Sequence, residues 1–349
     1  MNLLGVMSPK LKLIQNRPTK QSRKNERRKV GALSALVVQP RTQKRYHNAF
    51  KQFCQFHNLS EAFVLPDFHV FDEWVADYVE QLWDEGSPKS EASYALAAIQ
   101  FFRPQAKNHL VWSWKLVKTW NQVELPTRAT PLTPELLLSM AGQAFHWRQH
   151  RFGWLLVLGF SAFLRTSELI NLERKAVILP EHGRPREAVL LLTDTKGTKK
   201  SLLPLDKTVL DEQVALQALQ YLCSGLQPGD TLSQMSNKAF RTLFQQLLEA
   251  LSLQDQGYRP YSLRRGGVTS AYRQGVPLDV LVTKGRWQHL PTARLYIDAG
   301  LQSLAQISHP PQTLRLCAKM RQCFRTVTQD GARGMKAGKC QSRLADPSK

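Results

Sequence analysis

Three prolines within ten residues divide this chain into two parts. They fall in residues 125–134, LPTRATPLTP. Proline fixes its own φ and moves the residue before it out of the helical region, so this segment should be extended and stiff. Thr133 followed by Pro134 favours a helix start, with Glu135 in its first turn. We therefore predict a linker over residues 125–134, with a folded domain on either side.

The part before the linker carries apolar residues at helical spacing. Such stripes occur over residues 46–54, 71–82, 94–102 and 112–123. Pro104 should stop the third helix, because proline is poorly tolerated inside a helix. The pattern predicts an all-α module over residues 40–124. Its aromatic side chains are better suited to a core than to stacking on bases.

The part after the linker mixes helical and strand patterns. A hydrophobic helix is expected over residues 154–163, and short apolar runs at 188–193 and 201–205 flank a lysine-rich turn with a glycine. Helices should follow from about 206 to 223 and over 238–251. We predict a mixed α+β domain over residues 135–308, in a protein that is mainly α with a small β-sheet.

Both ends of the chain are basic. Residues 1–35 hold nine Lys and Arg against one acid, and residues 309–349 are also basic, with Gly and Ser among them. Such segments cannot bury a core, so both are predicted to be disordered. The first one could be a solubilising tail, a nuclear-import signal in KNERRK, or an arm on DNA phosphates. The arm would use a cluster of four cations: Lys24, Arg27, Arg28 and Lys29.

The overall charge narrows the class of partner. The formal net charge is +21, which points to a polyanion, nucleic acid first and an anionic membrane surface second. No apolar run approaches the roughly 18 residues of a membrane span. Five cysteines are scattered without a paired motif or a histidine cluster, which predicts reduced thiols in an intracellular protein. We expect no metal site and no cofactor.

The residues with the most specific chemistry lie in two segments. Arg264 sits in a glycine-flanked run, where its guanidinium can hold a phosphate in a bidentate fork. Tyr296 follows Trp287 by nine residues and can attack a phosphate if its phenol is activated. Arg165 breaks a hydrophobic run and needs an anionic partner, for which Glu168 is available. Taken singly, each of these residues is ordinary, since a Tyr or Trp is more often part of a core.

Taken together, these residues resemble the boxes of the tyrosine recombinase (phage integrase) family. That family carries His-x-x-Arg, then His or Trp, then a nucleophilic tyrosine nine residues later. Here Tyr261 stands in the histidine position ahead of Arg264, and LRTSEL from residue 164 is similar to the first arginine box. The family also has a lysine at a β-turn. Lys196, before the glycine of the predicted turn, matches it, with Lys199 and Lys200 as alternatives. The resemblance spans roughly residues 40–305.

The resemblance implies a fold and a reaction. The fold would be a four-helix (SAM-like) core-binding domain followed by the catalytic domain. Tyr296 would attack a DNA phosphodiester to form a 3′-phosphotyrosyl link, and religation would need neither metal nor ATP. Two arginines would neutralise the transition state, Trp287 would donate its indole N–H, and Lys196 would protonate the leaving 5′-oxygen. Glu168 would brace the first arginine box.

Tyr261 departs from the family pattern. A phenol can donate a hydrogen bond to the phosphate, but with a reference pKa of about 10 it is a poor base near neutral pH. Arg265 and Arg286 are added to the predicted DNA contacts. Double-stranded DNA is the expected partner, with self-association to a tetramer at synapsis.

Three function classes follow from the resemblance. The first is an active recombinase or integrase, a type of enzyme that mobile elements encode. The second is a domesticated relative that binds DNA without cutting it, and the third is a type IB topoisomerase-like enzyme. The helical module before the catalytic domain favours the first over the third. The expected location is the nucleus in a eukaryote, and otherwise the cytoplasm or nucleoid.

Overall fold

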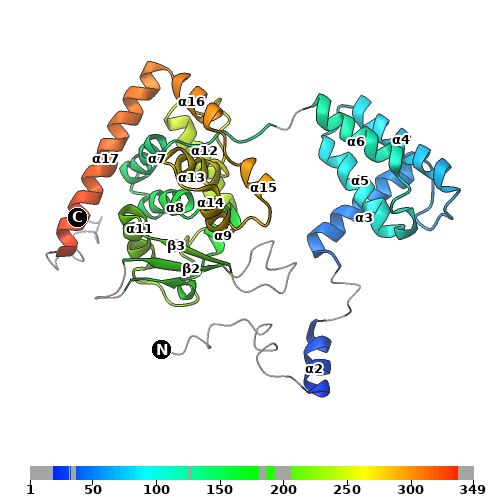
Figure 1. Ribbon diagram of the computed structural model, residues 1–349, viewed down its shortest axis with the longest axis horizontal. Helices are drawn as coiled ribbons and strands as arrows, with labels where there is room; N and C mark the ends of the chain where they lie inside the picture. Colours follow the sequence, from blue (N-terminus) through cyan, green and yellow to red (C-terminus); the bar gives the residue numbers. More distant parts are fainter. Residues whose placement is uncertain are drawn as a thin grey trace, which may run out of the picture. The chain divides into compact units, whose positions relative to one another are not determined.

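A computed structural model of the chain describes residues 19–30, 32, 37–124, 127–180, 186–192 and 206–336. Contacts divide the chain into two compact units, Met1–Thr127 and Arg128–Lys349 (Figure 1). The described part is mainly helical and contains a three-stranded antiparallel sheet. This confirms the predicted fold class.

The first unit is built on four helices that carry the four predicted apolar stripes. They are α3 (Pro40–Phe56), α4 (Phe68–Asp84), α5 (Lys89–Phe102) and α6 (Val111–Val123). Their aromatic residues Phe50, Phe53 and Phe71 are buried in one hydrophobic core. The Asp72 carboxylate on α4 accepts hydrogen bonds from the first backbone N–H groups of α6, at Trp112 and Ser113. A buried carboxylate therefore caps one helix from the side of another.

A further helix, α2 (Lys20–Val30), lies in the segment that we predicted to be disordered. These residues are therefore helical in the structure, whereas the disorder of the arm in isolation stays a prediction. The segment is rich in Lys, Arg and Gln, which have good helix propensity. Three basic residues occupy its last turn, where cations interact favourably with the helix dipole. Lys29 also pairs with Glu26 at 2.8 Å.

The second unit surrounds a buried helix with other helices and one small sheet. Helix α8 (His150–Ser161) is buried at every residue from Phe152 to Ser161. It packs against α7 (Pro134–His146), α9 (Thr166–Asn171), α11 (Gln213–Cys223) and α13 (Ser262–Arg273). The unit also contains the 3₁₀ turn η4 (Arg174–Ala176), α12 (Asn237–Ala250), α14 (Leu278–Gly285), α15 (Leu290–Arg294), α16 (Ala299–Ile307) and α17 (Pro311–Lys336). Because α8 ends at the segment that carries Arg165, the core fixes the place of that arginine.

The sheet has the order β1 (Val177–Ile178), β2 (Ala188–Leu192), β3 (Asp206–Leu210), with antiparallel neighbours. The second predicted strand, 201–205, lies outside the described residues. The helix predicted to start near 206 begins only at Gln213, and a strand precedes it. Thr208 pairs with Leu190 across the ladder and is buried. This pairing between distant segments favours a strand over the predicted helix. The β-branched residues Thr208 and Val209, which have high strand propensity, favour it too.

The chain after residue 308 is also more ordered than we predicted. Helix α17 packs along α7, as the red and green helices at one side of Figure 1 show. Its buried residues Thr313, Cys317, Met320 and Phe324 fall at i, i+4, i+7 and i+11, which is one helical stripe. Phe324 stacks on Phe145 of α7 with ring centroids 5.3 Å apart. The prediction of a disordered tail over 309–349 is therefore wrong up to residue 336, because a basic composition concealed an amphipathic helix.

Candidate active site

Two adjacent glycines bring α13 against the end of α8. A Cβ on Gly266 would lie 2.4 Å from the Leu132 carbonyl oxygen, and one on Gly267 would lie 2.1 Å from that of Phe160. Neither position has room for a side chain. Gly266 therefore lets α13 approach the backbone at Leu132, and Gly267 lets it approach the end of α8. Arg264, about one turn earlier on α13, lies next to the segment that follows α8.

Arg264 is completely buried. Its Nη1 donates to the Phe163 carbonyl oxygen at 2.5 Å and its Nη2 to that of Gly285 at 2.6 Å. Its guanidinium carbon lies 4.7 Å from the centre of the Trp287 ring and 5.2 Å from that of Tyr296. Burial, followed by the nearby cations, lowers the pKa of Arg264 to about 10, so that it stays charged at neutral pH.

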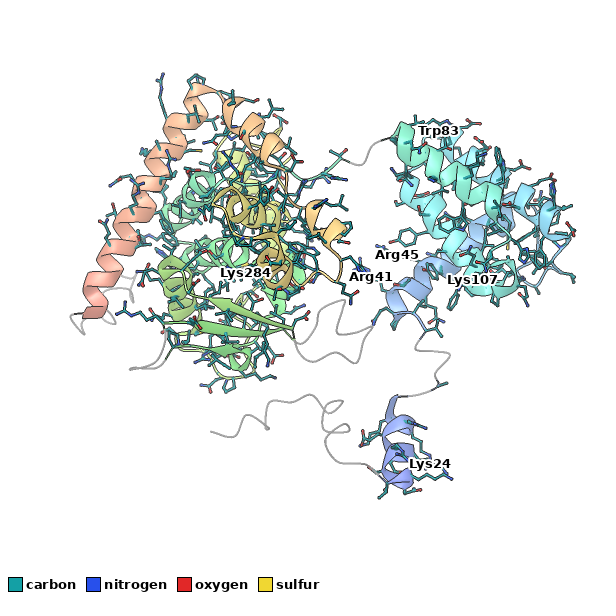
Figure 2. All side chains as sticks on the ribbon, in the orientation of Figure 1. Lys24, Arg41, Arg45, Trp83, Lys107 and Lys284 are labelled. Atoms are coloured by element: carbon teal, nitrogen blue, oxygen red, sulfur yellow. The ribbon has the colours of Figure 1, made fainter. Side chains whose placement is uncertain are left out.

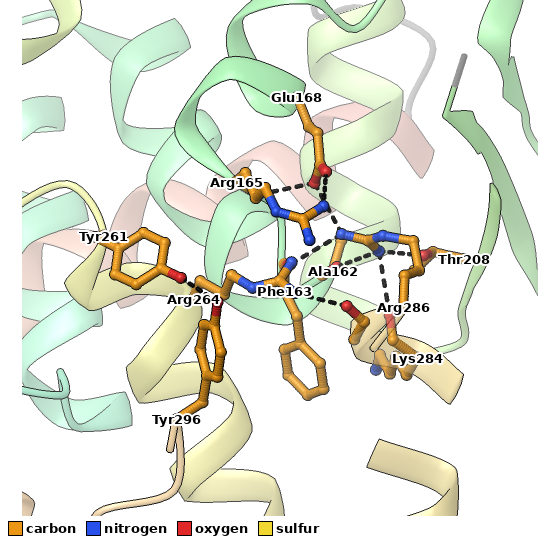
Figure 3. Close-up of polar contacts among 11 residues, drawn as sticks. Ala162, Phe163, Arg165, Glu168, Thr208, Tyr261, Arg264, Lys284, Arg286 and Tyr296 are labelled. Atoms are coloured by element: carbon orange, nitrogen blue, oxygen red, sulfur yellow. Dashed lines mark hydrogen bonds and ion pairs between the residues drawn. The ribbon is translucent and has the colours of Figure 1, made fainter. Parts of the chain in front are cut away.

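Arg165 and Glu168 form one buried ionic group with Arg286 (Figure 3). The Glu168 carboxylate accepts from the Arg165 backbone N–H at 2.8 Å and from Arg165 Nη1 at 2.5 Å. Arg286 Nη2 reaches its other side at 2.8 Å. Burial raises the pKa of Glu168, but Arg286 and then Arg165 outweigh it and hold that pKa below its usual value. Glu168 is thus a permanent anion between two cations.

Three aromatic side chains meet beside Arg264. The Tyr261 hydroxyl donates a hydrogen bond to the Tyr296 hydroxyl. The Tyr296 ring centroid lies 4.6 Å from that of Trp287 and 5.7 Å from that of Tyr261. Thr269 Oγ1 donates to the Tyr296 carbonyl oxygen at 3.1 Å, which fixes the backbone after α15.

The two phenols have opposite pKa shifts. Burial, and then the hydrogen bond that it donates to Tyr296, raise the pKa of Tyr261. Partial burial opposes ionisation of Tyr296 as well, but the hydrogen bonds from Tyr261 and Trp287, and then the charge of Arg264, outweigh it and lower its pKa. Tyr296 is therefore the phenol that ionises more easily, and Tyr261 is the donor that supports its anion.

The structure brings most of the predicted site residues together. Those that meet are Arg165, Glu168, Tyr261, Arg264, Trp287 and Tyr296. The predicted lysine Lys196 and its alternatives Lys199 and Lys200 lie outside the described residues. The four cations of the proposed arm lie exposed on α2 (Figure 2 labels Lys24).

Two arginines predicted to contact DNA have partners inside the protein. Arg265 is 3% exposed, and its Nη1 donates to the Ala129 carbonyl at 2.6 Å while its Nη2 pairs with Asp298 at 3.3 Å. Arg286 is held by Glu168 and by backbone carbonyls. These partners account for much of the donor capacity of both guanidinium groups, and phosphate contacts by Arg265 and Arg286 stay a prediction.

The described residues show two further absences. Among them, no group of three His, Cys, Asp or Glu side chains could hold a metal ion. Within the same ranges, no helix is long and apolar enough to cross a membrane.

Comparison with known proteins gives matches among solved structures. No family model and no curated protein matches this sequence. The Tn1549 transposon integrase in complex with transposon right end DNA superposes with a TM-score of 0.56 at 15% identity, covering 78% of this chain and 94% of that one. A lambda integrase dimer bound to a COC′ core site gives 0.54 at 15% identity, covering 81% and 96%. This chain has the tyrosine-recombinase fold.

The XerH site-specific recombinase bound to difH substrate, in its pre-cleavage complex, matches more weakly. Its TM-score is 0.50 at 14% identity, with 76% of this chain and 77% of that chain covered. At these identities the likeness establishes the fold, and the predicted resemblance is confirmed at that level. The tyrosine-recombinase fold explains why residues as distant as Arg165 and Tyr296 converge on one site.

The sequence-based prediction missed several partners within this candidate site. These are the backbone carbonyls of Phe163 and Gly285 and the side chains of Thr208 and Thr269. Backbone acceptors leave no trace in residue type, so no sequence signal identifies them. Thr208 could have been placed from the sequence if residues 206–210 had been recognised as a strand. Side chains alternate between the two faces of a strand, and this alternation puts Thr208 on the buried face of the sheet.

The phenol pair gives a prediction that needs no DNA. Tyr261→Phe removes the hydroxyl that donates to Tyr296, so the phenolate at 296 loses a stabilising partner and its pKa should rise. Carbon-13 NMR of protein with Cζ-labelled tyrosine measures this, with Tyr296→Phe to assign the signal. Tyr272→Phe, at an exposed tyrosine of α13, is the matched control and should leave that signal unchanged. An equal Tyr296 pKa in Tyr261→Phe and the parent would show that the contact does not acidify Tyr296.

Proposed function

We propose that this chain is a DNA breaking and rejoining enzyme, a site-specific recombinase or integrase, with Tyr296 as its nucleophile. One observation carries the proposal: the phenol with the lowered pKa lies against the buried Arg264, and the partly exposed Arg165 adds a second positive charge nearby. A nucleophile beside preorganised cations suits attack on an anionic phosphodiester.

Unused hydrogen-bond donors support phosphate as the group bound here. Among the described residues, the buried Arg264 Nε has no hydrogen-bond partner. A buried donor without a partner is costly, and bound phosphate oxygens would satisfy it. Within the described residues, the Arg165 side chain donates to Glu168 through Nη1, and a quarter of that side chain is exposed. Both arginines can therefore contribute to the charge of a pentacovalent transition state.

The chemistry is a balanced exchange of phosphate esters. The Tyr296 Oη forms a bond to phosphorus while the bond from phosphorus to the 5′-oxygen breaks. This leaves a 3′-phosphotyrosyl link and a 5′-oxygen that takes up a proton. The tyrosine loses its own proton, and the hydrogen bond from Tyr261 stabilises the phenolate that results. Because the ester retains the energy of the cut bond, religation needs no ATP.

Two roles in this proposal come from the resemblance alone. A lysine of the β-turn, Lys196 by sequence, would give its proton to the leaving 5′-oxygen as a general acid. Double-stranded DNA would be the substrate, with several copies of the chain assembled on it at synapsis. The matched Tn1549 integrase is in complex with DNA, and the matched lambda integrase is a DNA-bound dimer. For this chain we extend that assembly to a tetramer.

Covalent capture tests the proposed function. Protein incubated in EDTA with a library of nicked suicide duplexes of random sequence should yield a protein–DNA adduct. Such a duplex loses the short strand after cleavage, which blocks religation. Digestion and mass spectrometry should place the nucleotide on the peptide that contains Tyr296. Binding without any adduct would instead favour the DNA-binding relative, and relaxation of supercoils without strand exchange would favour the topoisomerase-like enzyme.

The exposed cations of α2 give a prediction about salt. Changing Lys24, Arg27 and Arg28 together to Gln keeps helix propensity but removes three charges. If they contact phosphates, binding should weaken for all DNA sequences, and the slope of log K against log salt should fall by about 0.9 per lost contact. A charge-preserving control, with Lys and Arg exchanged at the same positions, should keep the parent slope. An unchanged slope in the Gln variant would assign the helix to import or solubility.

A further inference from the structure

Arg286 lies in a backbone conformation that suits glycine. It ends α14 with φ 58° and ψ 45°, in the left-handed region where the helix-ending residue is commonly Gly or Asn. Its side chain is nevertheless only 3% exposed. An arginine here bears both backbone strain and the cost of burying a charge, so its side chain needs compensating contacts.

Those contacts join three separate segments of the domain (Figure 3). Arg286 Nη2 donates to Glu168 on α9 at 2.8 Å and to the carbonyl of Phe163, in the turn between α8 and α9, at 3.0 Å. Its Nη1 donates to Thr208 Oγ1 of β3 at 2.6 Å and to the Lys284 carbonyl at 3.1 Å. One guanidinium thus ties the α8–α9 turn and β3 to the end of α14.

Two of these ties, those to Phe163 and Glu168, lead to the two arginines proposed to bind phosphate. The Phe163 carbonyl that Arg286 holds also accepts from Arg264 Nη1. Gly285, the residue before Arg286, gives its carbonyl to Arg264 Nη2. The Glu168 carboxylate that Arg286 holds is the anion that binds Arg165. We propose that Arg286 is the positioning residue that sets both Arg165 and Arg264 for the phosphate, an inference that rests on the proposed function.

Charge explains how Arg286 acts on Arg165. A carboxylate offers a planar pair of oxygens that a single arginine can take in a bidentate contact. Here Glu168 Oε1 accepts from Arg165 Nη1, while Arg286 Nη2 donates to Oε2. Oε2 also accepts from the Arg165 backbone N–H, so Arg286 and that N–H together occupy it. The Arg165 fork therefore engages Oε1 alone, which leaves the rest of that fork for a phosphate.

The same turn also sets the tryptophan. A Cβ on Gly285 would lie 1.8 Å from the six-membered ring of Trp287, so the left-handed residue between them folds the indole back over the glycine. That fold brings the Trp287 ring under the Arg264 guanidinium. Arg286 thus combines a backbone conformation that places Trp287 with a side chain that places two arginines.

Two variants separate positioning from simple helix ending. Arg286→Lys keeps the charge but cannot donate to several partners from a planar group. Arg286→Gly suits the left-handed backbone but has no side chain. We expect single-turnover cleavage of suicide DNA to fall by about 10²-fold in each, the cost of a catalytic group displaced by about 1 Å. DNA binding should stay within about twofold, since the loss is in placement rather than charge at the surface. Cleavage at the parent rate by Arg286→Gly would overturn the proposal.

A matched control is Arg151→Lys. Arg151 is another partly buried arginine that donates to two carbonyl oxygens, those of Leu222 and Leu232, in a different part of the domain. It should leave cleavage close to the parent rate. An equal loss of cleavage in Arg151→Lys and Arg286→Lys would show that general loosening of the fold is responsible, and would overturn the positioning role.

A modified substrate tests whether Arg286 acts through the phosphate-binding arginines. A methylphosphonate at the scissile position replaces one non-bridging oxygen by a methyl group, which removes the charge that an arginine neutralises. The rate ratio of parent to Arg286→Lys should shrink on that substrate. The double variant that combines Arg286→Lys with Arg165→Lys should cleave DNA only slightly more slowly than Arg165→Lys alone. The inference would be overturned by two results together. The rate ratio would be the same on the methylphosphonate as on the ordinary phosphate, and the rate losses of the two single variants would multiply in the double variant.

Failure of the proposed function would be seen separately, as a parent protein that forms no adduct on any DNA. The positioning role would then be decided by NMR of the nitrogen-15-labelled arginine side chains. The Arg165 Nε–Hε signal, assigned with Arg165→Lys, should shift or broaden in Arg286→Gly and stay in place in Arg151→Lys. An Arg165 signal that is the same in the parent and in Arg286→Gly would overturn the inference.

Discussion

Tyr296→Phe should abolish the covalent protein–DNA adduct while leaving DNA binding unchanged. The substitution removes the only atom that forms the proposed ester, so the expected loss is to below detection. The Phe ring keeps the packing against Trp287, whose centroid lies 4.6 Å away, and against the Arg264 guanidinium. Folding should therefore survive. The measurement is adduct yield on nicked suicide DNA in EDTA, beside a binding isotherm on the same duplex.

Tyr261 is the strongest alternative candidate for the nucleophile. Tyr261 contacts the Tyr296 hydroxyl and could itself attack if the assignment were reversed. Tyr261→Phe should slow adduct formation without abolishing it. Tyr272→Phe, at an exposed position on α13, should match the parent. An adduct that survives Tyr296→Phe and maps to the peptide of Tyr261 would contradict the nucleophile assignment.

Arg165→Lys should reduce the single-turnover cleavage rate by about 10²–10³-fold with little change in DNA affinity. That range is the usual loss when one preorganised donor to a transition-state oxyanion is removed. Lysine can keep an ion pair with Glu168, which lies 2.5 Å from Arg165 Nη1, but it lacks the planar fork. The rate should be measured at saturating protein, so that binding does not limit it.

A nearby arginine gives the matched control for this variant. Arg174 follows α9 in the turn η4 and donates to the Val177 carbonyl at 3.0 Å. Arg174→Lys makes the same chemical change outside the site and should leave cleavage near the parent rate. If affinity and cleavage fall together in Arg165→Lys, then Arg165 serves mainly as the structural partner of Glu168, and the catalytic role assigned to it is wrong.

The sequence alone determined the elements whose signals are local. Apolar stripes at helical spacing predicted the helices of the first unit. The glycine pair beside Arg264 and the nine-residue step from Trp287 to Tyr296 marked the candidate site. Helix periodicity, caps and motif spacing each depend on residues a few positions apart, so a single sequence carries them. For the same reason the residues of the site could be named before their contacts were known.

Only the tertiary structure decided which partner each buried charge and hydroxyl has. Tyr261 could donate to a phosphate by its residue type, but the fold places its hydroxyl on Tyr296. Arg286 could bind DNA by its charge, but the fold surrounds it with Glu168 and backbone carbonyls. The order of α17 depended likewise on the surface of α7, which receives Phe324. A guanidinium, a phenol or an amphipathic stripe has several possible partners of similar energy. Which of them it meets depends on segments far away in the chain, brought near by the packing of the whole domain.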